Sequence, residues 1–170
     1  MIKKETKTLL NDQVNKEWAS AYLYLDMANY YADKDLNGFA NWFNVQAQEE
    51  RDHAGLFNQY LLNNDIRPAL QDVAAPTEDY ADYRAPISKA FAHEQSVTAS
   101  INNIYAAASA DKDFRTMQFL DWFVKEQGEE EKSIQDILKR YGLFGGDAKS
   151  LYLLDSELAA RVYAAPSLVL

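Results

Sequence analysis

The chain has 170 residues, a net charge of −9 and no cysteine. Domains commonly span about 100 to 200 residues, so this length predicts one domain with one substantial core. Without cysteine, disulfides, thiolate zinc sites and iron–sulfur clusters are excluded, and any metal must use oxygen and imidazole ligands. The acidic balance, with no basic stripe, argues against nucleic acid or an anionic membrane as partner and favours cations.

The first ten residues, MIKKETKTLL, are charged and lack the apolar stretch of a signal peptide. No apolar run approaches the roughly 18 residues that a membrane-spanning helix needs. We therefore expect a soluble, cytoplasmic protein.

The first half of the chain predicts a helical hairpin. Only 6 glycines and 4 prolines occur, and they cluster where periodic segments end. The first helix is expected over about residues 5–31, and a short turn at residues 35–38 leads to a second that ends near residue 63. From residue 64 to about 83 the pattern lapses. This connection is too long for a hairpin turn and can cross the length of a bundle.

The second half predicts another hairpin and one extra helix. A third helix follows over about residues 86–110, and residues 111–113 (DKD) offer a cap for a fourth, which ends near residue 141. A shorter fifth helix is expected over about residues 147–162. The prediction is an all-α four-helix bundle with one long crossover and a short C-terminal helix, in one domain over residues 1–170.

Each long helix carries a stripe of residues spaced alternately four and three apart, which is typical of helices packed nearly parallel. Polar residues interrupt every stripe near its middle. The four stripes are Leu10, Val14, Glu17, Ala21, Tyr24, Ala28; Phe43, Ala47, Glu50, Ala54, Phe57, Leu61; Ile87, Phe91, Glu94, Thr98, Ile101, Tyr105; and Leu120, Phe123, Gln127, Glu130, Ile134, Ile137.

The two hairpins are related to each other. A shift of 77 residues pairs Glu17 with Glu94, Glu49 with Glu126, Glu50 with Gln127, and His53 with Glu130. Because a long connection joins the hairpins, the bundle can place both polar layers at the same height.

Four glutamates would then meet in the core, at positions 17, 50, 94 and 130, with no Lys or Arg on the stripes. Burying ionised carboxylates costs several kcal/mol each, so the charge must be compensated. Protonation is one route. Two divalent cations would also balance four carboxylates, with His53 as a neutral nitrogen ligand. Since residues three apart share a helix face, Glu50 and His53 can hold one metal while Glu50 bridges to another. The charge balance favours a dinuclear metal site.

Several local motifs carry a resemblance to a known family. They are NKE at residues 15–17, AYLY at 21–24, QEERDHA at 48–54, HEQ at 93–95 and WFVKEQGEE at 122–130. The chain resembles the ferritin-like di-iron carboxylate proteins, and among them the bacterial non-haem ferritins, over nearly its whole length. The resemblance implies that Glu17, Glu50 and His53 bind one iron, and that Glu50, Glu94 and Glu130 bind the second.

The resemblance also implies roles around this pair. Gln127 is expected close to the second iron, and Tyr24 and Trp122 beside both. From the residues alone, Tyr24 is equally well read as a core aromatic whose hydroxyl is satisfied, and Trp122 as packing. A redox or gating role for Tyr24 therefore rests on the resemblance.

A third iron site is implied as well, built from Glu49, Glu126, Glu129 and Glu130. Glu49 and Glu126 lie about 100° around their helices from the central stripe, so they flank the pair instead of entering it. Without the resemblance, the acidic run that includes Glu126 and Glu129 would be read as a solvated helix face.

The activity implied is oxidation of Fe(II) by dioxygen or peroxide, followed by storage of ferric mineral in a homo-oligomeric cage of about two dozen subunits that meet through the fifth helix. Haem is not expected, because bacterioferritins carry a second Glu-x-x-His and a methionine haem ligand, whereas this chain has Gln127-x-x-Glu130 and Asp52. The alternative is a metal-stabilised bundle with a structural or partner-binding role. A structural site is usually closed by protein ligands, whereas a ferroxidase site needs open positions.

Overall fold

The computed structural model describes residues 2–76 and 79–170. Within them the chain forms five helices and no strand: α1 (Lys4–Asp33), α2 (Asn37–Asn63), α3 (Ala85–Ala110), α4 (Phe114–Phe144) and α5 (Ala148–Leu158). The predicted all-α bundle with a short fifth helix is confirmed. Across the described ranges, none of the helices combines the length and the apolar character that a bilayer crossing requires.

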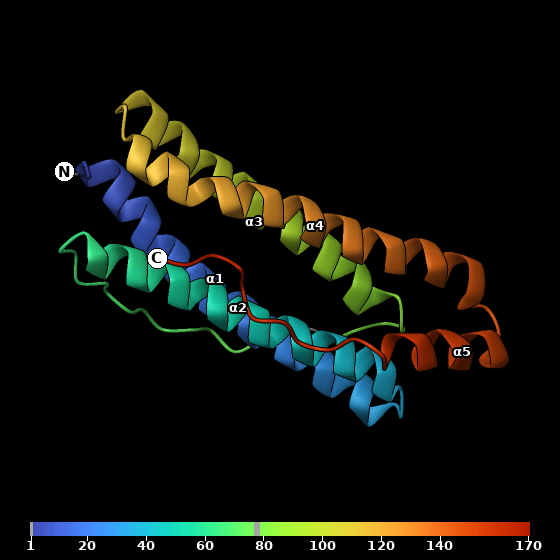
Figure 1. Ribbon diagram of the computed structural model, residues 1–170. Coiled ribbons are helices and arrows are strands. Elements are labelled where there is room, and N and C mark those ends of the chain that lie inside the picture. Colours follow the sequence, from blue (N-terminus) through green and yellow to red (C-terminus); the bar gives the residue numbers. More distant parts are fainter. Residues whose placement is uncertain (1, 77–78) are drawn as a thin grey trace.

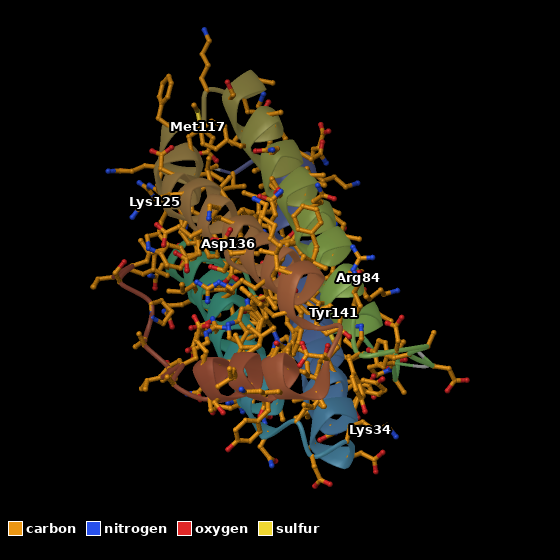
Figure 2. The ribbon with its side chains drawn as sticks, turned by 90° about the vertical axis from the view of Figure 1, so that its right-hand side faces the viewer. Lys34, Arg84, Met117, Lys125, Asp136 and Tyr141 are labelled. Carbon is orange, nitrogen blue, oxygen red and sulfur yellow. The ribbon has the colours of Figure 1, made fainter. Side chains whose placement is uncertain are left out.

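The four long helices form two hairpins, α1 with α2 and α3 with α4, and α5 packs across one end against α2 and α4 (Figure 1). Viewed from the side in Figure 2, Lys34, Arg84 and Tyr141 lie toward this end, and Met117 lies toward the other. Every hairpin therefore places the middle of its helices at a similar height in the bundle.

The connection between the hairpins follows α1. Asn11 exchanges hydrogen bonds with the backbone of Ala69, at 2.7 and 3.1 Å, near the start of α1. Farther along the helix the Tyr80 hydroxyl donates to Asp26 at 3.1 Å. The crossover thus runs the length of the bundle, as its length predicted.

Two predicted helix starts are confirmed, but two helix ends differ: α4 runs to Phe144, past the predicted residue 141, and its C-cap is Gly145. Asp113 caps α4 by accepting from the backbone N–H of Thr116, and Asp147 caps α5. Helix α5 ends at Leu158, short of the predicted residue 162. The reason lies in α2, where Asn41 donates to the carbonyl oxygens of residues 159 and 161 and fixes them outside the helix.

Gly38 allows α5 to approach α2 closely. It was expected in the turn between α1 and α2, but it lies in the first turn of α2. A Cβ atom at this position would lie only 1.7 Å from the carbonyl oxygen of Asp155. The Asp155 side chain also accepts from the backbone N–H of Phe39 at 2.9 Å. The missing side chain therefore fixes where the fifth helix docks.

The core consists of two apolar clusters separated by a polar layer. One lies around Tyr31, Phe43 and Ile134, and the other around Phe57 and Phe123. All predicted stripe residues of α1, α2 and α4 are buried. The stripe predicted for α3 is partly wrong. Its half-buried positions are Phe91, Thr98 and Tyr105, and the residues buried in their place are Ala90, Val97, Ile104 and Ala108.

Candidate metal centre

The polar layer brings side chains from two helices to one point. Glu17 projects from α1, and Glu50 and His53 project from successive turns of α2. All three are buried, and one ligand atom from each lies within 4.8 Å of the others. Glu50 and His53 share a face because they are three residues apart, and their Oε2 and Nδ1 atoms lie 3.5 Å from each other.

One atom of this group has no hydrogen-bond partner. Gln13, one turn before Glu17, donates to Glu17 Oε1 at 2.8 Å. Within the described part of the chain, Glu17 Oε2 is buried and has no hydrogen-bond partner. Buried polar atoms are nearly always paired, so an unsatisfied carboxylate oxygen beside another carboxylate and an imidazole is suited to a cation.

The other half of the layer is held by neutral donors. The Tyr24 hydroxyl donates to Glu94 Oε1, and the Gln127 amide donates to Glu94 Oε2 at 3.0 Å. Gln46 donates to Glu130 Oε2 at 2.7 Å. These bonds orient Glu94 and Glu130 toward the layer without neutralising them.

Burial dominates the electrostatics of the four carboxyl groups. It raises the pKa of Glu17 and of Glu50 well above the ordinary value, and the neighbouring carboxylates raise both further. The pKa of Glu94 is raised by burial, although the hydrogen bonds from Tyr24 and Gln127 oppose the shift. Burial and the charge of Glu94 raise the pKa of Glu130 to about 8. The cluster therefore favours protons or cations at every position.

The flank of the layer, which carries Glu49, Glu126 and Glu129, contains two ion pairs that the sequence did not predict. Glu126 and Glu130 do approach His53, with one ligand atom from each residue within 4.8 Å. Glu49 pairs instead with Arg161 from the C-terminal segment, at 2.5 Å. Glu129 is largely exposed and pairs with Lys125 at 3.2 Å. Of the four residues expected for a third site, Glu126 and Glu130 thus form a group with His53, while Glu49 and Glu129 each pair with a cationic side chain.

Two aromatic side chains border the centre. The Trp122 ring lies edge-on to the His53 ring, with centroids 5.6 Å apart. Tyr24 is fully buried, and burial, followed by the charge of Glu94, raises its pKa well above the ordinary value. Both lie beside the candidate ligands, as the resemblance implied.

The sequence interpretation missed three polar residues of the site: Gln13, Gln46 and Arg161. The first two have a readable signal, because each precedes a core glutamate by one helical turn. Arg161 has none, since it lies 112 residues from Glu49 in the chain and outside every helix.

A helical bundle with one long crossover and a mid-height cluster of glutamates and one histidine defines the class of ferritin-like carboxylate proteins. A family model described as Ferritin, ferritin-like domain, matches residues 7–143. Bacterial non-haem ferritins from Staphylococcus haemolyticus and Staphylococcus aureus are each 35% identical over 163 residues, covering 96% of this chain and 98% of theirs. The chain belongs to the ferritin family.

Solved structures agree with this assignment. A closed form of the Archaeoglobus fulgidus ferritin, engineered by mutagenesis, is 39% identical, with a TM-score of 0.93 over 96% of this chain and all of that one. The open-pore ferritin of the same archaeon is 39% identical, with a TM-score of 0.92 over 95% of this chain and 98% of that one. The fold similarity therefore extends over α5 as well as the bundle.

Proposed function

We propose that this protein stores iron and is a ferroxidase, oxidising Fe(II) with dioxygen at the centre formed by Glu17, Glu50 and His53 together with Glu94 and Glu130. The observation that carries the proposal is a buried Glu17 oxygen without a partner among the described residues, on a side chain that groups with Glu50 and His53 in the core. The relatives named as non-haem ferritins support it.

The donor set suits iron as a substrate in both oxidation states. Carboxylates are hard ligands that stabilise Fe(III) and can change between bridging and terminal binding, and one imidazole fixes one end of the site. Glu50 Oε2 lies 3.5 Å from His53 Nδ1, and Glu50 is also close enough to Glu94 and Glu130 for their charges to raise its pKa. We assign it as the bridge between two ferrous ions, each of which gives one electron to dioxygen.

The residues around the ligands hold them without competing for metal. Gln13 and Gln46 donate to glutamate oxygens. Tyr24 and Gln127 hold both oxygens of Glu94. A hydrogen-bonded ligand keeps its orientation between turnovers, so these donors limit the reorganisation that each oxidation requires.

Storage requires a container, and we propose a cytoplasmic homo-oligomeric cage of about two dozen subunits that meet through α5. The solved relatives support a cage in that they include an open-pore ferritin and an engineered closed form of it. Ferric product formed in the bundle would pass to the cavity as mineral.

The experiment that tests the proposal combines particle size with iron content. Purified protein is loaded aerobically with ferrous iron in large excess, and the particle is sized by light scattering. We expect an amber product with many irons per subunit inside a large closed particle. A small particle that holds no more than two or three metals per subunit, without turnover, would support the structural alternative.

A further inference from the structure

The C-terminal segment after α5, residues 159–170, lies extended along α2 (Figure 1). We call it the strap. Asn41 of α2 donates to its backbone at residues 159 and 161. Farther along, the Tyr163 hydroxyl donates to Asp52, and Trp122 of α4 donates to Ser167 at 3.0 Å. The strap therefore crosses the face of the bundle that α2 and α4 share.

The first side chains of the strap point alternately toward the bundle and toward solvent, as extended backbone requires. Arg161 and Tyr163 are turned toward the protein, whereas Val162 and Ala164 are exposed. The inward positions put Arg161 and Tyr163 over the turns of α2 that also carry Glu49, Glu50 and His53.

Arg161 makes four contacts at the edge of the metal centre. Its guanidinium donates to Glu49 Oε2, to Gln46 Oε1 at 2.8 Å and to the carbonyl oxygen of Trp42 at 3.2 Å. It also lies 4.2 Å from the centroid of the Trp42 ring. A planar cation with this many partners is held in one position.

The contact with Gln46 reaches a candidate ligand. Arginine has no acceptor, so the amide oxygen of Gln46 must face it, which directs the amide nitrogen the other way. That nitrogen donates to Glu130 at 2.7 Å. Arg161 thus holds Glu49 directly and orients the donor to Glu130.

We propose that Arg161 is a positioning residue that controls a third cation: its guanidinium neutralises Glu49 while only the central pair is bound, and it must leave Glu49 before another metal ion can be held there. This inference rests on the proposed function. Binding of the third ion and closure of the strap then exclude each other, because two cations compete for one carboxylate.

The arrangement of charge around the flank favours this competition. Glu126, Glu130 and His53 already form a group that can hold a metal ion. Glu49 lies close enough to this group for its charges to act on it: burial raises the pKa of Glu49, the charges of Arg161 and His53 oppose the rise, and the charge of Glu126 adds to it. Of the flanking carboxylates, Glu129 has its own partner in Lys125 at the surface. Releasing Glu49 is therefore the step that completes the flank.

Zinc, which is redox-inert, tests the inference without any oxidation. Calorimetric titration of the assembled wild-type protein should give two tight zinc ions per subunit and a weaker third. In Arg161→Gln the third ion should bind about tenfold more tightly, a coupling of usual size between two sites, while the first two change by less than about threefold.

Tyr163→Phe is the matched control, since it removes a strap contact to Asp52 and leaves Arg161 in place. It should leave the third ion within about threefold of wild type. An unchanged third ion in Arg161→Gln overturns the inference, as does an equal gain in Tyr163→Phe, which would assign the effect to the strap in general. Failure of wild-type protein to bind the first pair would instead overturn the proposed function, and the inference with it.

A second measurement uses the wild-type chain alone. Hydrogen exchange of the peptide covering residues 159–170 is followed during the zinc titration. Because coupling between two sites is reciprocal, exchange should stay constant through the first two equivalents and rise with the third. Binding of a third ion with no rise in exchange would overturn the competition between Arg161 and metal.

Discussion

The central layer and its flank both carry glutamates, but they differ in what neutralises them. In the centre, Glu17 and Glu50 are buried, and their pKa values are raised first by burial and then by neighbouring charges. On the flank, Glu49 pairs with Arg161 and Glu129 pairs with Lys125. The centre therefore favours protons or cations from outside the chain, whereas Glu49 and Glu129 on the flank have cationic side chains that a metal would have to displace.

This difference between centre and flank predicts that iron oxidation is slowed most by replacing Glu50, which we propose as a ligand of both central metals. Glu50→Ala should lower the initial rate of iron oxidation by more than about a hundredfold, beyond the range found for outer-shell partners of metal ligands. Stopped-flow absorbance after mixing with Fe(II) measures the rate. A wild-type initial rate in this variant would show that Glu50 does not bridge.

The same variant separates binding from folding. Removing one carboxylate from a repulsive cluster relieves strain, so metal-free Glu50→Ala should be at least as stable as the metal-free wild type. Thermal melting in chelator measures this. A drop of many degrees would mean that Glu50 stabilises the core by some contact other than metal binding.

The number of ferrous ions bound per subunit distinguishes ligands in the centre from residues on the flank. Glu94→Ala should weaken one of the two central irons, because Glu94 lies in the buried layer. Glu49→Ala should keep both, since Glu49 lies beside the layer and pairs with Arg161. Anaerobic ferrous titration gives the stoichiometry. Two unaltered irons in Glu94→Ala, or none in Glu49→Ala, would show that centre and flank have been exchanged.

The pH dependence of the metal-free protein tests whether the centre lacks a cation. The pKa of Glu130 is raised to about 8, so the folded state holds this proton more tightly than the unfolded state. Its stabilising contribution is complete below the ordinary glutamate pKa and is lost as the pH rises through about 8. We expect the free energy of unfolding in chelator to fall over this window by an amount on the order of a few kcal/mol. The melting temperature should fall with it.

Two comparisons give this pH experiment its control. Glu130→Gln should make the fall smaller, because the amide cannot ionise, while the other three carboxyl groups with raised pKa values still can. Zinc should abolish it in the wild type, since bound cations replace the protons. A melting temperature that stays level in chelator from pH 5 to pH 8 would contradict the account of the centre.

The sequence predicted those features that depend on local periodicity. The stripes of α1, α2 and α4 were readable because each has one consistent register, and the polar breaks in them located the central glutamates. In α3 two stripes share Ile87, Glu94 and Ile101, so the register was ambiguous. Phe91 and Tyr105 favoured the wrong one, since aromatic residues at a stripe edge resemble core residues.

Features that depend on contacts between distant segments were not predictable in this way. The end of α5 is set by Asn41, and the position of α5 is set by the small size of Gly38. Arg161 reaches the centre from a segment without helical periodicity. A pattern on one helix contains no information about a side chain that arrives from another part of the chain.

The smallest effect on stability and iron binding is expected from replacing Glu129, at the outer edge of the flank. The side chain of Glu129 is 62% exposed, and that of its partner Lys125 is 79% exposed. Exposed ion pairs contribute about 0 to 1 kcal/mol, so Glu129→Ala should hardly change the stability. The first two irons should bind as in the wild type, and only later turnovers should change.

Lys125→Ala distinguishes the two reasons why Glu129 could matter. If Glu129 acts only through the surface ion pair, both variants will alter turnover alike, because each removes the same pair. If Glu129 becomes a ligand when iron passes along the flank, only Glu129→Ala will slow the later turnovers, and Lys125→Ala will leave them unchanged or faster, since the lysine competes with the metal for the same carboxylate. Multiple-turnover oxidation assays of the two variants at equal iron load decide between these outcomes. Equal slowing in both would remove Glu129 from the iron path and leave Glu49 and Glu126 as the ligands of the flank.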